Sequence, residues 1–190
     1  MEKTLELPEE PVEKIDVFAF EFPELNPFIL NTRVGKKRVD LFNYRYPSTQ
    51  GECKGVVVHF HGLGGYTGHL AFMAKEYADR GFDFVGFDQR GHGRSNGLTT
   101  YFPDFEEVLE DSYLFARQVK LAYPGKNVYA AGSSMGGLVS LSLAQRYPEL
   151  FSALVLTAPL IDSPILQSKK FMCFLGCMGK IVPTKRINIP

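Results

Sequence analysis

The sequence predicts an α/β fold, with a mostly parallel sheet, an antiparallel start near the N-terminus and helices on both faces. From residue 55 onward, short apolar segments alternate with longer segments of helical periodicity, as in βαβ units. The first of these, 55–60, is a continuous β-branched run typical of a strand buried on both faces. A glycine-flanked turn at 132–136 then separates an apolar segment from a helical one, which fits the same alternation.

The expected strands are short and mostly bounded by Gly or Pro. Alternation of side chains predicts strands at 15–22 and 38–46, which together could form the antiparallel start of the sheet. Continuous apolar runs then predict strands at 55–60, 82–88, 127–132 and 152–157.

Helical spacing of apolar residues predicts three helices between these strands. We expect them at 69–80, which Gly81 ends, at 103–122, which Pro103 opens, and at 135–146. In the second helix, Asp111 lies among Glu106, Glu107 and Glu110, and we expect these four to form a solvated acidic face. Right-handed crossovers through such helices give a parallel sheet.

Composition bounds the class of protein. The chain has 190 residues, 45% of them hydrophobic, and 21 basic residues balance 21 acidic ones, so no basic excess indicates a nucleic-acid partner. Three cysteines are too few for a disulfide framework, and Cys173 with Cys177 supplies too few ligands for zinc. We therefore expect a reducing, cytoplasmic environment, no metal and no cofactor. The acidic segment 1–13 has no apolar core of a secretory signal.

Ser134 is the candidate nucleophile. It is the central residue of Gly132-Ser133-Ser134-Met135-Gly136, a G-x-S-x-G sequence in the strand–turn–helix context of a nucleophile elbow. Such a turn holds the serine in a strained backbone conformation, and only small neighbours fit beside it. The hydroxyl then projects from the top of the sheet, above the N-terminus of the next helix.

A serine hydroxyl needs a general base, and the sequence shows none in the expected place. In folds built around this elbow the chain order is Ser, then Asp or Glu, then His. The four histidines, His59, His61, His69 and His92, all precede Ser134. We assign none of them proton transfer and interpret the chain as the front part of a longer hydrolase.

A glycine-rich loop follows the buried strand at 55–60. In His61-Gly62-Leu63-Gly64-Gly65 the backbone can approach an acyl carbonyl closely, so we expect the Leu63 N–H to be one oxyanion donor. The second donor is expected to be the N–H of Met135. Gly62 permits the approach, and His61 is expected to brace the loop by hydrogen bonding.

A second polar loop, Asp88-Gln89-Arg90-Gly91-His92-Gly93-Arg94-Ser95, follows the strand at 82–88. We expect Asp88 and Arg90 to tie this turn together, because their position before Ser134 argues against Asp88 as the acid of a triad.

Together these residues resemble the monoacylglycerol lipase and lysophospholipase branch of the α/β-hydrolases, a serine aminopeptidase-type domain. The resemblance covers 40–165 and includes both loops, the elbow and Leu156-Thr157-Ala158-Pro159. It implies an α/β-hydrolase fold that is incomplete at the C-terminus. The resemblance also implies Ser134 as nucleophile and an acid and a histidine from strands beyond residue 190. The charges and two prolines of 1–13 predict that this segment is a loose arm, and the resemblance implies the front of the core at 14–163 and the start of a cap at 164–190.

The implied activity of the full-length protein is hydrolysis of an acylglycerol or lysophospholipid ester through an acyl-enzyme on Ser134. Peptide or thioester cleavage and acyl transfer use the same core and remain alternatives. A different class, an inactive scaffold that only binds, also remains open.

The C-terminal segment 171–182 carries an apolar helical stripe flanked by lysines. Two interpretations stand: the stripe packs on its own protein, or it forms a lid or a membrane-facing surface for greasy substrates. The sequence gives no oligomeric state.

Overall fold

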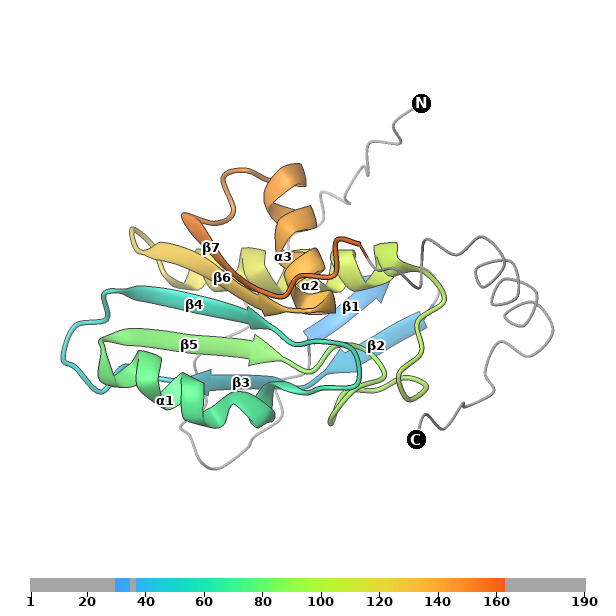
Figure 1. Cartoon of the computed structure of the whole chain (residues 1–190), viewed down its shortest axis with the longest axis horizontal. Helices are drawn as coiled ribbons and strands as arrows, with labels where there is room; N and C mark the ends of the chain where they lie inside the picture. The colour runs from blue at the N-terminus through green and yellow to red at the C-terminus, as the bar shows by residue number, and fades with distance from the viewer. Residues whose placement is uncertain (1–29, 35–36, 163–190) are drawn as a thin grey trace.

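The computed structural model describes residues 30–34 and 37–162, with side chains from residue 40 onward. Its centre is a five-stranded sheet in the order β3-β5-β4-β6-β7 (Figure 1). These strands are β3 (Asn43–Tyr46), β4 (Gly55–Phe60), β5 (Phe82–Phe87), β6 (Asn127–Ser133) and β7 (Ala153–Thr157).

Strand directions match the prediction of a mostly parallel sheet with an antiparallel start. β4 is parallel to both β5 and β6, and β6 is parallel to β7. β3 is antiparallel to β5, with Asn43 opposite Phe87. Because these strands are parallel, their carboxyl ends lie at the same end of the sheet. The loops after β4, β5 and β6 therefore lie close together there.

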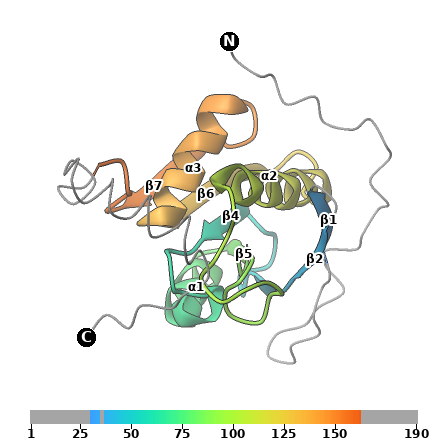
Figure 2. The ribbon, with the colours of Figure 1, turned by 90° about the vertical axis from the view of Figure 1, so that its right-hand side faces the viewer.

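Helices cover both faces of the sheet, as predicted. α1 (Ala71–Asp79) lies on one face, whereas α2 (Phe105–Ala122) and α3 (Met135–Arg146) lie on the other (Figures 1 and 2). None of the helices in the described ranges is both long and apolar enough to cross a membrane.

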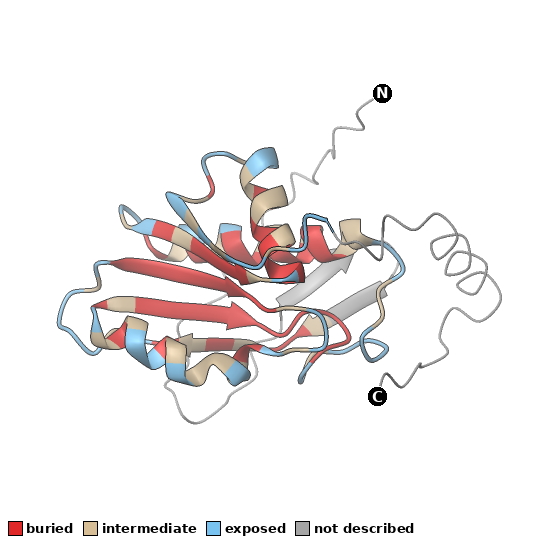
Figure 3. Ribbon diagram, in the orientation of Figure 1, coloured by how far each residue is buried: buried red, intermediate tan, exposed pale blue. Residues whose placement is uncertain are grey.

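The core has two layers because successive side chains of a strand point to opposite faces. In β4, Val56, Val58 and Phe60 pack with the α2 and α3 side chains, whereas Val57 packs with the α1 side. All six residues of β4 are buried, which confirms the interpretation of its continuous apolar run (Figure 3). At the β7 edge of the described sheet, the Val155 side chain is half exposed.

The prediction of one strand at 38–46 is wrong. β2 (Lys37–Leu41) pairs with β1 (Leu30–Val34) in a separate antiparallel hairpin, and only β3 joins the main sheet. The break falls at Phe42, whose N–H donates to Ser95 Oγ at 2.8 Å and whose carbonyl accepts from the Asp88 N–H at 2.8 Å. These bonds replace ladder bonds, so the strand leaves one sheet and enters the other.

Smaller differences concern helix starts. The chain at 69–80 begins as a 3-10 turn, η1 (Thr67–Leu70), before α1. α2 begins at Phe105 rather than Pro103, because the Asp104 side chain accepts from the Glu106 N–H and caps the helix. The predicted strand at 15–22, the arm at 1–13 and the cap at 164–190 lie outside the described residues.

Candidate active site

Ser134 lies at the turn between β6 and α3, and its backbone is in a region that L-residues rarely adopt, with φ 51° and ψ −119°. The residue is exposed to solvent. Its N–H donates to the Thr157 carbonyl at 3.1 Å, and its carbonyl accepts from the Leu138 and Leu160 N–H groups at 3.2 and 3.0 Å. Bonds to β7, α3 and the segment after β7 thus hold the strained turn in place.

Close backbone contacts explain the glycines around this turn. A Cβ added at Gly136 would overlap the Phe60 carbonyl oxygen, so the first turn of α3 rests directly on the end of β4. A Cβ added at Gly62 would lie 3.3 Å from the Ser134 Cβ. The loop after β4 therefore lies against the candidate nucleophile.

The two predicted oxyanion donors are the N–H groups of Leu63 and Met135. Met135 is the first residue of α3, where N–H groups have no partner within the helix and the helix dipole is positive. Leu63 directly follows Gly62 in the loop that contacts Ser134. Neither N–H donates to any acceptor among the described residues. Two free N–H groups beside a nucleophile are what a developing oxyanion requires, and their role stays a prediction.

Both ring nitrogens of His61 are engaged, one within its own loop and one with the loop after β5. Its ring is buried, Nε2 accepts from the Gln89 N–H at 2.8 Å, and Nδ1 lies 2.8 Å from the Gly62 carbonyl, to which it donates. Burial lowers the pKa of His61 to about 4, so the ring is neutral at pH 7. A neutral imidazole with both nitrogens occupied cannot take a proton from serine.

The other three histidines, all within the described residues, do not form hydrogen bonds with Ser134 either. His59 points from β4 into the core and stacks on Phe84 at 5.5 Å, and burial lowers its pKa to about 3. His92 is also buried. His69 is exposed at the end of η1.

Asp88 is completely buried and uses its carboxylate to hold loops together. It accepts from the Thr67 N–H at 2.9 Å, the Arg94 N–H at 2.9 Å and the Tyr44 hydroxyl at 3.1 Å. Burial raises the pKa of Asp88, although these three bonds oppose the rise. None of the four histidines, all of which lie in the described part of the chain, forms a hydrogen bond with this carboxylate.

Asp111 corrects the expectation of a wholly solvated acidic face. It is 1% exposed, and its two oxygens accept from Arg90 Nε at 2.7 Å and Nη2 at 2.9 Å. Glu107 contacts the same guanidinium. Arg90 therefore joins the loop after β5 to α2 rather than pairing with Asp88. Asp111 follows Val108 by three residues, which places it on the buried side of the helix.

Gln89 is a residue that the sequence analysis missed. Besides its backbone bond to His61, its side-chain Nε2 donates to the His61 carbonyl at 2.6 Å. No sequence signal indicates this role of Gln89, because its bonds to His61 form only when β4 and β5 become neighbours in the sheet.

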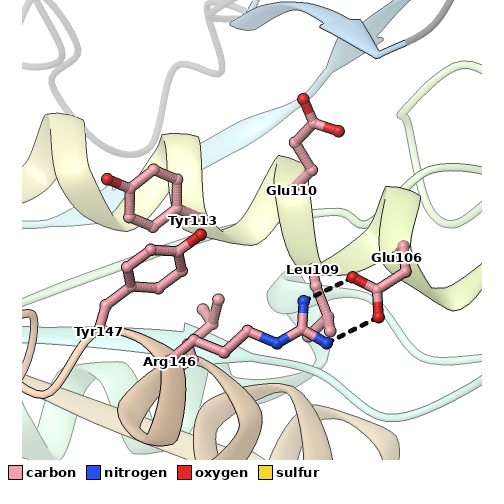
Figure 4. A pocket seen from close by; sticks show the side chains of 7 residues that line it. Glu106, Leu109, Glu110, Tyr113, Arg146 and Tyr147 are labelled. Atoms are coloured by element: carbon pink, nitrogen blue, oxygen red, sulfur yellow. Dashed lines mark hydrogen bonds and ion pairs between the residues drawn. The ribbon is translucent and has the colours of Figure 1, made fainter. Parts of the chain in front are cut away.

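Several hollows among the described residues have no lining from Ser134. One lies between α2 and α3, where Arg146 pairs with Glu106 and the rings of Tyr113 and Tyr147 stack (Figure 4). Another runs beside β3 and is lined by Tyr44, Tyr46, Tyr66, Gly68, Ala71, Gly93 and Arg94. A further one lies between the glycine-rich loop, at Gly64 and Gly65, and the loop after β5, at Gly91 and His92. Among residues 30–34 and 37–162, no three His, Cys, Asp or Glu side chains gather as metal ligands.

The chain is similar in sequence to known proteins. The monoglyceride lipase homolog of monkeypox virus is 31% identical over 135 residues, covering 71% of this chain and 49% of the viral protein. Caffeoylshikimate esterase of Arabidopsis thaliana is 34% identical over 128 residues, covering 65% of this chain and 39% of the plant protein. The chain thus spans less than half the length of either relative.

The fold also matches solved structures. A soluble variant of monoglyceride lipase from Saccharomyces cerevisiae superposes with a TM-score of 0.68 at 22% identity, covering 90% of this chain and 58% of the yeast chain. The sequence model described as "Serine aminopeptidase, S33" matches residues 51–189, well over half of the chain. With an elbow, a glycine-rich loop and a mostly parallel sheet in the arrangement that such hydrolases share, the chain belongs to this serine aminopeptidase family of α/β-hydrolases.

Proposed function

We propose that the whole protein is a serine hydrolase that cleaves carboxylic esters through an acyl-enzyme on Ser134. The observation that carries this proposal is the strained, exposed Ser134, with the free N–H groups of Leu63 and Met135 on the two segments next to it. Strain at an exposed serine has no structural benefit, and it puts the hydroxyl where a substrate can reach it.

In the proposed reaction, the Ser134 oxygen attacks the ester carbonyl carbon while a base removes its proton. The carbonyl oxygen becomes an anion, which the two N–H groups stabilise; each such donor typically contributes about 10²- to 10³-fold in rate. The C–O bond to the alcohol then breaks, the alcohol leaves with the proton, and water hydrolyses the acyl-enzyme. Because none of the four histidines bonds to Ser134, the proposed base is a histidine outside residues 1–190.

Apolar side chains around the turn favour an acylglycerol or lysophospholipid as substrate. Leu63 is 56% exposed beside Gly62, and Ile161 is 65% exposed next to Leu160, whose N–H binds the Ser134 carbonyl. Exposed apolar groups at this position suit an acyl chain. The names of the relatives, a monoglyceride lipase homolog and an ester-cleaving enzyme, support the same class. The cap at 164–190 and a membrane contact through 171–182 remain part of this proposal.

A fluorophosphonate probe tests the nucleophile in the full-length protein. We expect the probe to label Ser134, and S134A to lose both labelling and ester hydrolysis while circular dichroism shows an unchanged fold. The adjacent S133A is the matched control, and it should keep labelling. A folded wild-type protein that the probe does not label would refute the proposal. Rates on matched ester, thioester and amide substrates then separate esterase from thioesterase and peptidase activity.

A further inference from the structure

We propose that Asp111 and Gln89 are positioning residues for the oxyanion loop, although neither touches the site of reaction. The inference rests on the proposed function, because it assigns the Leu63 N–H to an oxyanion. The structure connects the middle of α2 to that loop through three hydrogen-bonded links: Asp111 with Arg90, the adjacent Gln89 with His61, and His61 with Gly62.

The first link is a buried ion pair that fixes the loop after β5. The Arg90 side chain is 7% exposed and that of Asp111 is 1% exposed, and both carboxylate oxygens meet the guanidinium in a two-bond arrangement. Without the Asp111 charge, Arg90 keeps only the carboxylate of Glu107, whose side chain is 28% exposed, so we expect the arginine and its loop to shift toward Glu107 and water.

The second link passes from this loop to the oxyanion loop. Gln89 directly precedes Arg90 and is 1% exposed. Its backbone N–H holds His61 Nε2 at 2.8 Å, and its side-chain amide holds the His61 carbonyl at 2.6 Å. Two bonds to opposite ends of one residue fix both the ring and the peptide plane of His61.

The last link ends at the proposed oxyanion donor. His61 Nδ1 donates to the Gly62 carbonyl, which also accepts from the Gly65 N–H at 3.0 Å. The plane of that carbonyl contains the Leu63 N–H, because both belong to the same peptide unit. Fixing the carbonyl of Gly62 therefore fixes the direction of the Leu63 N–H. A displacement of about 1 Å in such a group can cost roughly 10²-fold in rate.

The experiment uses three single variants of the full-length protein and the double variant D111N/Q89M. D111N removes the charge of the first link at constant shape, and Q89M removes the amide donor of the second link at similar volume. E106Q is the matched control: Glu106 is also an α2 carboxylate that meets an arginine through two bonds, Arg146 at 2.5 and 2.7 Å, but this pair lies at the surface between α2 and α3 (Figure 4).

Two quantities are measured for each variant with the fluorophosphonate probe: the amplitude of labelling, which counts folded sites, and its rate constant. We expect D111N and Q89M to lower the rate constant about 10- to 100-fold at preserved amplitude, and to lower kcat for an ester while KM is unchanged. E106Q should match wild type. The loss of labelling rate in the double variant should be smaller than the product of the two single losses, because both changes act on one chain of contacts.

The outcomes separate this inference from the proposed function. If wild type is labelled on Ser134 but D111N and Q89M lose only amplitude, the two residues are structural and the inference is wrong, while the hydrolase proposal stands. If D111N fails to fold, the rate constant of Q89M decides the matter alone. An unlabelled wild type refutes the proposed function itself.

Discussion

At the scale of single residues, the turn at Ser134 stores strain that its neighbours compensate. A positive φ of 51° with a ψ of −119° costs a non-glycine residue about 1–3 kcal/mol. Three backbone hydrogen bonds and the contact of Gly136 with the end of β4 hold the conformation. Glycine would adopt this conformation at a lower steric cost than serine. A serine at this position is therefore expected only where its side chain is needed.

Replacing the serine by glycine tests this strain. S134G should be more stable than S134A by about 1–3 kcal/mol, because glycine adopts the observed φ without steric cost. Urea unfolding of both variants measures the difference. Ser142, in the regular part of α3, is the control position, and there the order should reverse, with alanine more stable than glycine by about 1 kcal/mol. Equal stabilities of S134G and S134A would contradict a strained turn.

At the scale of elements, α2 packs against the core and also holds the loop after β5 in place. One side carries the core residues Val108, Phe115 and Val119, and the same side carries Asp111, which anchors Arg90. The periodicity of apolar residues predicts which side chains of this face are buried, but it predicts that an acidic residue is exposed. The burial of Asp111 therefore cannot be predicted until its partner Arg90 is known.

The start of α2 depends on the side chain of Asp104. D104A should destabilise the protein by about 1 kcal/mol, because the Glu106 N–H loses its acceptor and the negative charge at the helix N-terminus disappears. D104N keeps the acceptor and should recover most of the loss. Chemical denaturation of the two variants beside wild type measures both effects, and an unchanged midpoint for D104A would show that the cap is dispensable.

At the scale of the whole molecule, neutral histidines are part of the core. His59 and His61 are 1% and 2% exposed, and burial lowers their pKa values to about 3 and about 4. In the unfolded chain the pKa is about 6.5. Both residues thus bind protons more readily when unfolded, so their contribution to stability is complete above pH 6.5 and is lost as the pH falls toward the folded values.

Acidification should therefore destabilise the fold before carboxylates titrate. Between pH 6.5 and 5, each of the two histidines should remove about 2 kcal/mol from the free energy of unfolding. Urea unfolding at several pH values measures this decrease in the free energy of unfolding. In H59L the decrease should be about half as large as in wild type, whereas in H69Q, a change at an exposed histidine, it should be the same as in wild type. A flat profile between pH 6.5 and 5 would mean that the rings are hydrated in the folded state.

Most of the sheet could be predicted because its signals are local. The β-branched run of β4, the glycine after α1 and the G-x-S-x-G turn each determine a conformation through neighbouring residues alone. The hairpin strand β1 was missed, and the strand at 38–46 was wrongly continued through Phe42. The partners of Phe42 are Asp88 and Ser95, about 50 residues away in sequence, so no local pattern contains the break.

The sequence by itself determined the alternation of strands and helices, the strained turn with Ser134 at its centre and the glycine-rich loop that belongs beside it. Only the tertiary structure decided which polar groups are buried together: Asp111 with Arg90, and Gln89 with His61. The physical reason is that the backbone conformation of these particular segments follows from adjacent residues, whereas the partner of a buried charge or imidazole depends on which strands become neighbours in the sheet.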